Sequence, residues 1–522
     1  FFLWNGHQAL RIFMNRRVTR IQSISLINTM RALILLMGVV LILADPLDDI
    51  LYKRFKLYEK EEKMMLGSDI QLSKDELAAN QTIMDLKIKE LDSGFVNQNF
   101  SLSKYFFEYK DEVKKNRLFQ LIARMPKGAL LHAHDTGMLG PDYLLRLTYK
   151  KNLYVSFYKD DVCFYFSKTV PKFNTSCPCH AKWQLLKDLR YASGNIQQFD
   201  ENLRKYFTMQ QEDKNFDTNV AWQRFQKCFM VVAPLLQYKP VWEQYFNDTL
   251  YALKRDNVMY LEIRSLLPEL YDLEGRVYDS VETAETYKKV ADDFVIANPD
   301  FFGVKLIYAP SRQVNKNTLT KYLETAREIK KRMPDFFAGF DLVGQEDMGQ
   351  TLTYFLPELS NASDEFDLFL HAGETSWNGD NIDNNIFDAI ALGTKRIAHG
   401  YSLFKHPVLM EEVKKRMIPI EVNVISNAVL KLVHDVRNHP LANWLAQGLP
   451  VVLSSDDPGM WEATPLTHDF YVTFVAVANR HADLRLLKKL ALNSIHYSTY
   501  PEKLRMLEEF ENRWERFILT LR

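Results

Sequence analysis

The sequence lacks an excess of charge of either sign. Its 522 residues include 66 Lys and Arg and 66 Asp and Glu, so the formal net charge is zero. Proteins that bind nucleic acid carry a basic surplus, and the balance therefore argues against nucleic acid as a partner. A small molecule is the simpler expectation for the ligand. Internal repeats and low-complexity tracts are also absent, and 47% apolar residues exclude a disordered or fibrous chain.

Long hydrophobic runs are almost missing as well. The one pronounced run covers residues 32–44 (ALILLMGVVLILA), follows Arg31 and ends before the polar segment that starts at Asp45. Its length suits the apolar region of a signal peptide but falls short of the roughly 20 residues that a membrane span needs. We therefore expect residues 1–44 to be an N-terminal region with a signal peptide, starting naturally at Met30, and the protein to be secreted with no stable membrane span. A short signal anchor is the alternative.

Cysteine is scarce, with four residues in the whole chain. A disulfide from Cys163 to either Cys179 or Cys177 would close a local loop, and the spacing leaves the choice of partner open. Cys228 is expected to be a buried free thiol. Five sequons give mild support to a glycoprotein and begin at Asn80, Asn99, Asn174, Asn247 and Asn361.

The N-terminal part of the remaining chain is charged and helical in pattern. Apolar residues recur near helical spacing at Ile83, Leu86, Ile88 and Leu91, which predicts polar helices with a single apolar stripe. We assign residues 45–120 to a helical domain. It is either a cap on the main domain or a growth-factor-like module through which the chain forms a homodimer.

Short apolar runs separated by helical stretches fill the chain beyond Met125 and predict βα units around a parallel sheet. The eight expected strands are 129–134, 258–264, 304–309, 338–343, 366–371, 396–399, 418–424 and 451–456. Eight such strands indicate an α/β fold of the (β/α)8 TIM-barrel type over residues 121–522, with its chemistry at the carboxyl ends of the strands. The long gap after the first strand must hold an insertion, and we expect a small, disulfide-stapled, β-rich lobe at 150–205.

Polar residues at three of these strand ends suit a metal ion. His132 and His134 are two apart on a strand, so both imidazoles point to the same side. His371 ends another strand, and Asp456 ends the last. Three His and one Asp form a donor set that suits Zn²⁺ with one position left for water.

Further polar residues at the same strand ends suit proton transfer. His399 ends a strand of its own, and a neutral His there could take a proton from an activated water. Glu374 follows His371 after two small residues and could give a proton to the substrate if its pKa is raised. Together with a metal, these residues predict hydrolytic attack on a polarised carbon. The pattern of the zinc cytidine deaminases, H-x-E with P-C-x-x-C, does not occur.

Six motifs make residues 45–522 resemble the secreted adenosine deaminases, the adenosine deaminase 2 or adenosine deaminase-related growth factor group of the metal-dependent amidohydrolase-like barrels. They are MPKGALLHAHD (125–135), FDLVGQED (340–347), LFLHAGET (368–375), RIAHGY (396–401), IPIEVNVISN (418–427) and VVLSSDDPGM (451–460). The resemblance implies conversion of adenosine, and of 2′-deoxyadenosine, to inosine and ammonia, with one Zn²⁺ per chain, in the control of extracellular purine signalling.

The resemblance also implies a role for each site residue. Zinc ligands would be His132, His134, His371 and Asp456. The residues that act on the purine would be Glu374 as proton donor to N1, His399 as base or partner of the developing oxyanion, and Asp457 at N7. Residues against the rest of the nucleoside would be Asp135 at the ribose, the Gly344 backbone at N3, an aromatic wall of Trp222, Phe225 and Phe229, and Ser311, where the family has a His.

Two alternatives to this function stay open. One is another purine aminohydrolase, such as an AMP or adenine deaminase, which a cluster of phosphate-binding Arg and Lys residues at the site would favour. The other is a growth-factor-like protein that binds a cell-surface receptor or glycosaminoglycan, with catalysis secondary. An intact metal set argues against lost catalysis but leaves room for a second role.

Overall fold

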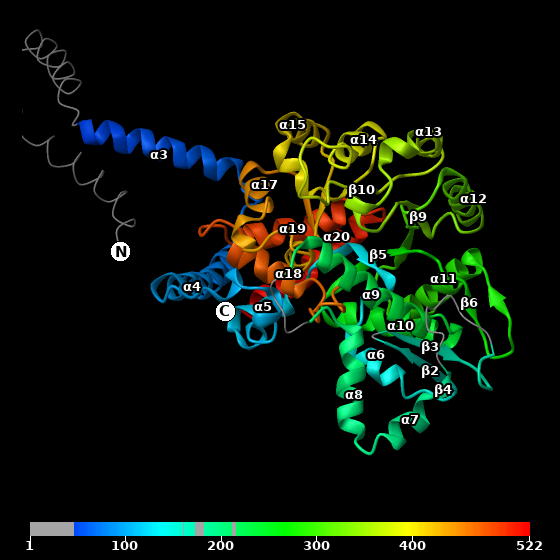
Figure 1. Ribbon diagram of the computed structural model, residues 1–522. Helices are drawn as coiled ribbons and strands as arrows, with labels where there is room; N and C mark the ends of the chain where they lie inside the picture. Colours follow the sequence, from blue (N-terminus) through cyan, green and yellow to red (C-terminus); the bar gives the residue numbers. More distant parts are fainter. Residues whose placement is uncertain (1–45, 160, 173–181, 211–215, 522) are drawn as a thin grey trace, which may run out of the picture. The chain divides into compact units, whose positions relative to one another are not determined.

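The computed structural model describes residues 46–159, 161–172, 182–210 and 216–521 (Figure 1). The chain divides into two units, residues 1–63 and 64–522, which are described separately. The expected signal-peptide run at 32–44, the sequon at Asn174, and Cys177 and Cys179 lie outside the described residues. Among the helices within those ranges, none is long and apolar enough to cross a membrane.

Eight parallel strands form the centre of the second unit. One sheet has the order β1-β5-β8-β9, and the other has the order β10-β11-β12-β13. The strands are β1 (Gly128–His134), β5 (Val258–Ser265), β8 (Val304–Tyr308), β9 (Phe337–Phe340), β10 (His371–Ala372), β11 (Ile397–His399), β12 (Ile420–Val422) and β13 (Val451–Leu453). They match the eight expected runs in order, although all except β1 and β5 are shorter than expected.

Two seams join these sheets into a closed barrel. At one seam Phe340 forms a parallel bridge with Leu368, just before β10. At the other, Ala133 on β1 forms a parallel bridge with Asp456, just after β13. Closure places all eight carboxyl ends around one opening, which confirms the expectation of an α/β fold of the TIM-barrel type.

Helices between successive strands cover the outside of the barrel (Figure 1). Capping fixes their starts: Asp279 and Glu282 form a capping box at α11, and the Asn315 side chain accepts the N–H of Thr318 in α12. The covering helices are α10 (Lys239–Arg255), α11 (Ser280–Ala297), α12 (Lys316–Arg332), α13 (Leu352–Ser363), α14 (Asn385–Ala391), α15 (Pro407–Arg416), α17 (Leu441–Gln447) and α19 (Leu484–His496).

Several short elements complete the covering layer. They include α16 (Val424–Val429), α18 (Thr467–Val472) and the π-helix that continues α18 over Thr473–Val477. The hairpin β6 (Leu270–Tyr271) and β7 (Val277–Tyr278) precedes α11. One continuous apolar core fills the space between strands and helices.

The insertion after β1 contains a small antiparallel sheet with the order β3-β2-β4. Its strands are β2 (Leu153–Tyr158), β3 (Asp161–Phe166) and β4 (Gln184–Leu185), and they lie with α6 (Pro141–Leu147), α7 (Leu186–Ala192) and α8 (Ile196–Arg204) in one lobe (Figure 1). The lobe is therefore β-rich at its centre and helical at its end. Cys163 is buried on β3, but both candidate partners lie outside the described residues, so the disulfide with Cys179 stays a prediction.

The longest helix of the insertion, α9 (Thr218–Leu236), leads back to the barrel. The Asp217 side chain accepts the N–H of Val220 and so caps its start. Cys228 lies on the buried side of α9 as a free cysteine, as expected, and burial raises the pKa of its thiol to about 12. The same helix brings Trp222, Phe225 and Phe229 toward the opening.

The N-terminal segment is helical, as the sequence indicates, with α4 (Lys74–Val96) and α5 (Arg117–Arg124) in the second unit. A capping box of Ser73 and Glu76 starts α4. Of the expected apolar stripe, Ile83 is fully buried in the core while Leu86 and Leu91 are half-buried. The last helix, α20 (Lys503–Leu519), packs near α4, and the Trp514 Nε1–H donates to Glu76 Oε1 at 2.8 Å.

Most of the first unit's described part is one helix, α3 (Pro46–Met64). Apolar side chains at Leu47, Ile50, Leu51, Phe55 and Tyr58 are each 47–60% exposed. Their spacing of three and four residues places them on one face of the helix.

Candidate metal centre and purine pocket

Four side chains from three strand ends meet at the barrel opening. The Nε2 atoms of His132 and His134, both on β1, lie 3.2 and 3.1 Å from Oδ1 of Asp456, which follows β13. The ring of His371, on β10, lies 4.8 Å from that of His132 and 5.4 Å from that of His134, measured between centroids. The structure thus brings together all four residues assigned to zinc by the sequence.

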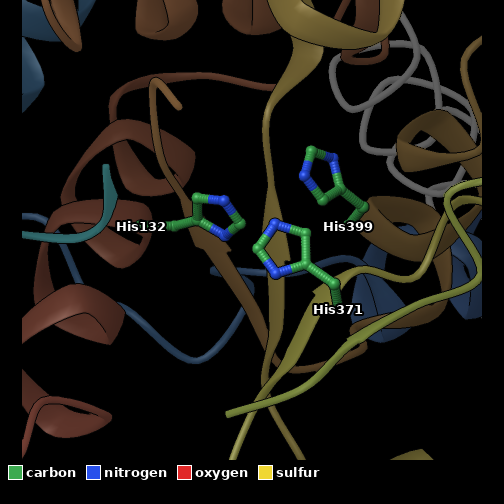
Figure 2. A group of neighbouring side chains, drawn as sticks. All are labelled: His132, His371 and His399. Atoms are coloured by element: carbon green, nitrogen blue, oxygen red, sulfur yellow. The ribbon is translucent and has the colours of Figure 1, made fainter. Parts of the chain in front are cut away.

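His399, at the end of β11, completes the cluster. Figure 2 shows the rings of His132, His371 and His399 converging from three different strands. Their ligand-capable nitrogens lie within 4.8 Å of one another, as do the ligand atoms of His132, His134 and Asp456. His399 Nε2 is 3.8 Å from Asp456 Oδ2. The donors therefore form one compact site, with His399 beside the four assigned ligands.

Buried carboxylates orient two of the histidine rings. Asp341 Oδ2 accepts the Nδ1–H of His371 at 2.6 Å, and Glu421 Oε2 accepts the Nδ1–H of His132 at 2.8 Å. Because each Nδ1 carries the proton, each Nε2 presents a lone pair to the centre of the site. Histidines that bind metals commonly have such carboxylate partners.

Two buried arginines hold those carboxylates. Arg264 on β5 donates to Asp341 at 2.8 Å and to Glu421 at 2.8 Å. Arg396 on β11 donates to Glu421 and, at 2.6 Å, to Glu262. Burial opposes ionisation of Asp341 and Glu421, but these cations and the adjacent His371 and His132 hold the pKa values of both carboxyls far below their usual range.

The donor set fits a cation. His132 Nε2 is buried and has no hydrogen-bond partner within the described ranges, and its lone pair faces the Asp456 carboxylate 3.2 Å away. Two acceptors at that distance repel unless a positive charge lies between them. Nitrogen donors completed by one carboxylate are the chemistry that Zn²⁺ prefers.

Glu374 lies on the loop after β10 and is 4% exposed. Its Oε1 is 3.4 Å from Nδ1 of His399. The carboxylate of Glu346 accepts the backbone N–H groups of Gly373 and Glu374 at 3.0 and 2.7 Å, which fixes the loop. Burial, with the nearby charges of Asp456 and Glu346, raises the pKa of Glu374 well above its usual value. A carboxyl in this state retains a proton to donate.

Asp457 and Asp135 lie on the other side of the opening. Burial, with the neighbouring carboxylates of Asp456 and Asp135, raises the pKa of Asp457. Gly137 makes room for this side chain, because a Cβ at that position would collide with Asp457 Oδ1. Asp135 is held by the hydroxyl of Tyr287, which donates to its Oδ2 at 2.6 Å, and by the N–H of Thr136.

Left-handed backbone conformations place two of these side chains. His399 has φ of 62° and Asp456 has φ of 59°, values that residues other than glycine seldom adopt. His399 ends β11 and Asp456 comes three residues after the end of β13, and both side chains line the cavity at the opening. Strain of this kind is characteristic of functional sites.

A cavity of about 410 Å³ leads from the metal cluster to the surface. Its volume suits a nucleoside-sized ligand. The residues assigned to the substrate all line it: Asp135, Trp222, Phe225, Phe229, Ser311, Gly344 and Asp457. Glu374 and His399 line its inner end. The rings of Phe225 and Phe229 are 4.8 Å apart, and that of Trp222 is 5.4 Å from Phe225, so α9 presents a continuous apolar wall.

Several residues that build the site have no role in the sequence-based assignment. Asp341, Glu346 and Glu421 lie inside the six motifs without an assigned role, and Glu262 and Arg264 lie outside these motifs. Their contacts join residues up to 289 positions apart, as for His132 and Glu421, so only the closed barrel reveals them. For Glu262, Arg264 and Glu421, the available signal was a charged side chain within an otherwise apolar strand.

Comparison with known families gives two matches. The adenosine deaminase model covers residues 196–512, and the adenosine/AMP deaminase N-terminal model covers residues 38–122. An adenosine deaminase of Phlebotomus duboscqi is 43% identical over 91% of this chain and 92% of its own length. Adenosine deaminase 2 of Homo sapiens is 39% identical over 89% of this chain and 92% of its own length.

Solved structures share the fold at lower identity. An N6-mAMP deaminase of Arabidopsis has a TM-score of 0.54 and 18% identity, covering 75% of this chain and 99% of its own. An amidohydrolase of Burkholderia ambifaria, with bound zinc, has a TM-score of 0.51 and 17% identity, covering 77% and 94%. From its family matches and from relatives that align over nine-tenths of its length, this chain belongs to the adenosine deaminase family, as its six motifs indicate.

Proposed function

We propose that this protein is a zinc-dependent adenosine deaminase that hydrolyses adenosine, and 2′-deoxyadenosine, to the corresponding inosine nucleoside and ammonia. One observation carries the proposal: a cation-binding set of His132, His134, His371 and Asp456 adjoins a buried acid, Glu374, at the inner end of one cavity. Water supplies the oxygen that replaces the amino group at purine C6. The amino group leaves as ammonia.

The four donors would hold one Zn²⁺. The fit rests on the buried lone pair of His132 Nε2 and the facing carboxylate of Asp456. When bound, zinc acidifies water, which makes hydrolysis feasible at neutral pH. The bound zinc of the Burkholderia amidohydrolase is in keeping with this assignment.

The protein's own groups would carry the remaining chemistry. Glu374, kept protonated by burial, is placed to give its proton to purine N1, which draws electrons from C6 and favours attack there. His399 lies 3.4 Å from Glu374 and 3.8 Å from Asp456, beside the candidate ligands, and would interact with the attacking oxygen. Asp457 and the Gly344 backbone would hold the N7 and N3 sides of the base, while Asp135 and Ser311 would lie toward the ribose.

The wall on α9 would contact the face of the purine. Trp222, Phe225 and Phe229 offer apolar rings, and aromatic rings stack favourably on bases. With substrate bound, the apolar wall would help to keep water from the inner end of the cavity, which would strengthen the electrostatic interactions there.

The lining of the cavity favours a nucleoside over a nucleotide. Among the described residues that line it there is no Lys or Arg, whereas several carboxyls face it. Among these residues a 5′-phosphate would therefore meet no cation to offset its charge. This observation weighs against the AMP deaminase alternative.

The decisive experiment follows the fall in adenosine absorbance with the purified mature chain. We expect turnover of adenosine and 2′-deoxyadenosine, loss of turnover after zinc chelation, recovery on adding Zn²⁺, and little turnover by Glu374→Ala. AMP and adenine are tested as alternative substrates in the same assay. If adenosine, 2′-deoxyadenosine and adenine all remained unchanged with the zinc-loaded protein, the proposal would fail.

We also propose that the protein is secreted and acts as a homodimer in control of extracellular purine signals. The dimer is supported by the exposed apolar face of α3, which could pack against the same face of a second copy of the chain. This face is formed by Leu47, Ile50, Leu51, Phe55 and Tyr58. Light scattering at micromolar concentration tests the dimer: Ile50→Glu with Phe55→Glu should give a monomer, and a monomeric wild type would contradict it. A receptor or glycosaminoglycan partner stays a prediction.

A further inference from the structure

A chain of hydrogen bonds runs from the outer layer of the barrel to His399. His439, just before α17, lies 2.9 Å from Asn427 on α16, measured from Nε2 to Oδ1. The Asn427 side chain continues to His399, with its Nδ2 3.3 Å from His399 Nδ1. All three side chains are at most 2% exposed. These hydrogen bonds thus connect the outer layer of the barrel to a residue of the reaction centre.

The direction of every bond in the chain follows from its first member. The backbone N–H of Leu441 donates to His439 Nδ1 at 3.0 Å, and a backbone N–H can only donate. Nδ1 of His439 therefore has a lone pair. Burial lowers the pKa of His439 to about 3, so the ring is neutral and its single proton lies on Nε2.

The position of that proton determines the orientation of the Asn427 side-chain amide. Because His439 Nε2–H donates, the atom of Asn427 that faces it must be the carbonyl Oδ1. The NH₂ group of Asn427 must then point the other way and donate to His399 Nδ1. A nitrogen that accepts a hydrogen bond carries no proton, so Nδ1 of His399 has a lone pair as well.

We propose that His439 and Asn427 are positioning residues that keep the proton of neutral His399 on Nε2, so that His399 donates a hydrogen bond into the reaction centre instead of accepting a proton there. The proposal rests on the proposed function for its catalytic meaning. Of the two roles that the sequence leaves open for His399, base or oxyanion partner, it selects the second. Donors aimed at developing negative charge are among the strongest catalytic devices in enzymes.

The same chain of hydrogen bonds affects the protonation state of Glu374. Its Oε1 is 3.4 Å from His399 Nδ1, and an ionised carboxylate would there oppose a nitrogen lone pair. A protonated Glu374 removes the repulsion. Hydrogen-bond directions that begin at a backbone amide thus favour the acid form of Glu374, the form needed to protonate purine N1.

The test combines kinetics with ¹⁵N NMR of ring nitrogens in the zinc-loaded, full-length protein labelled at histidine. In the wild type we expect His399 to show a protonated Nε2 and an unprotonated Nδ1. Asn427→Asp replaces the NH₂ donor by an acceptor of the same shape, which moves the His399 proton to Nδ1. We expect kcat for adenosine to fall about 10²- to 10³-fold, with KM and zinc content close to those of the wild type.

A pair of isosteric variants at His439 tests the direction of the chain. His439→Gln retains an N–H donor toward Asn427 Oδ1 and should keep the wild-type ¹⁵N pattern. His439→Glu presents an acceptor, forces the Asn427 amide to turn over and should reproduce the kinetics and spectrum of Asn427→Asp. If the two variants lost kcat equally while His399 kept its proton on Nε2, His439 would be only structural.

His468 provides a matched control. It is also fully buried, its Nδ1 accepts the N–H of Thr464 at 2.9 Å, and its Nε2 donates to the Lys110 carbonyl at 3.0 Å, away from the cavity. His468→Gln should lower Tm without changing kcat below the melting transition. A proton on Nδ1 of His399 in the wild type, or wild-type kcat in Asn427→Asp, would overturn the proposal. If the wild type did not deaminate adenosine, the proposed function would fail, but the ring spectrum would still report the tautomer.

Discussion

Asp341 holds His371 at two points. Its Oδ1 accepts the backbone N–H of His371 at 2.8 Å, and its Oδ2 accepts the ring Nδ1–H at 2.6 Å. One carboxylate therefore fixes both the backbone at the start of β10 and the rotation of the His371 imidazole. The orientation of His371 Nε2 toward the cluster depends on a residue at the end of β9, a different strand.

Replacing this carboxylate should weaken metal binding. In Asp341→Asn the amide keeps the shape of the side chain but loses the charge that makes the His371 ring a stronger donor. We expect zinc affinity to fall about 10- to 100-fold, measured by competition with a chromophoric chelator. Asp367→Asn serves as the control, because this half-exposed aspartate on the loop before β10 pairs with Lys395 at the surface. Equal affinities in the two variants would contradict the role of Asp341.

The aromatic wall should contribute to substrate affinity more than to chemistry. Phe229, on α9, lines the cavity but is not one of the candidate metal ligands or proton-transfer residues. Stacking of a base on an aromatic ring is worth about 1 to 3 kcal/mol, so Phe229→Ala should raise KM for adenosine about tenfold and change kcat little. Steady-state kinetics measure the split. Phe387→Ala removes a partly exposed ring from α14 and should match the wild type; an unchanged KM in Phe229→Ala would remove Phe229 from the pocket.

Lys87 should make stability depend on pH. Its Nζ donates to the carbonyls of Asn479 and Ala482 at 2.8 and 2.7 Å and lies 4.2 Å from the centroid of the Phe474 ring. Burial lowers its pKa from 10.5 to about 7, although Asp483 opposes the shift. Between these two pH values the unfolded state binds more protons than the folded state, so this residue makes the free energy of unfolding rise with pH.

Denaturant unfolding at several pH values between about 7 and 10 measures the effect of Lys87. In Lys87→Met the rise of the unfolding free energy with pH should be smaller than in the wild type. Lys89→Met removes an exposed lysine from the same helix, α4, and should leave the rise as it is. Equal pH dependence in wild type and Lys87→Met would contradict the expectation.

The thiol of Cys228 should be inert in the folded protein. Burial on α9 raises its pKa to about 12, so the reactive thiolate is rare near neutral pH. We expect a disulfide reagent to modify this thiol at least about 100-fold more slowly in the native than in the unfolded chain. Comparison with Cys228→Ser isolates the signal from position 228. Rapid modification under native conditions would show that α9 opens from the barrel.

Local pattern predicts the barrel well because each strand lies in a short apolar run, and five of the eight expected runs end in a polar residue. The pair His132 and His134 also follows from strand geometry, since residues two apart share a face. Asp341 and Glu421 could not be assigned in this way. Their partners His371 and His132 lie on other strands, and the register between strands comes from barrel closure rather than from any one segment.

The insertion shows a second limit of prediction from sequence. Its β-rich centre follows from alternating aromatic residues, but the position of α9 across the cavity depends on the packing of the whole lobe. Trp222 and Phe229 could therefore be placed at the substrate only through family resemblance. The chain of His439, Asn427 and His399 was out of reach for the same reason, because His439 alone looks like an ordinary core histidine.

The seam between β13 and β1 links the metal centre to the integrity of the barrel. The backbone N–H of His134 donates to the Asp456 carbonyl at 3.1 Å, and the Asp456 N–H donates to the His132 carbonyl at 3.1 Å. Three residues whose side chains we assign to zinc thus also supply the hydrogen bonds of closure. Amide exchange at His134 and Asp456 should quicken when zinc is removed, while the Phe340 and Phe369 amides at the opposite seam serve as an internal reference. The exchange rates of these two amides would therefore report whether zinc is bound, in the absence of any substrate.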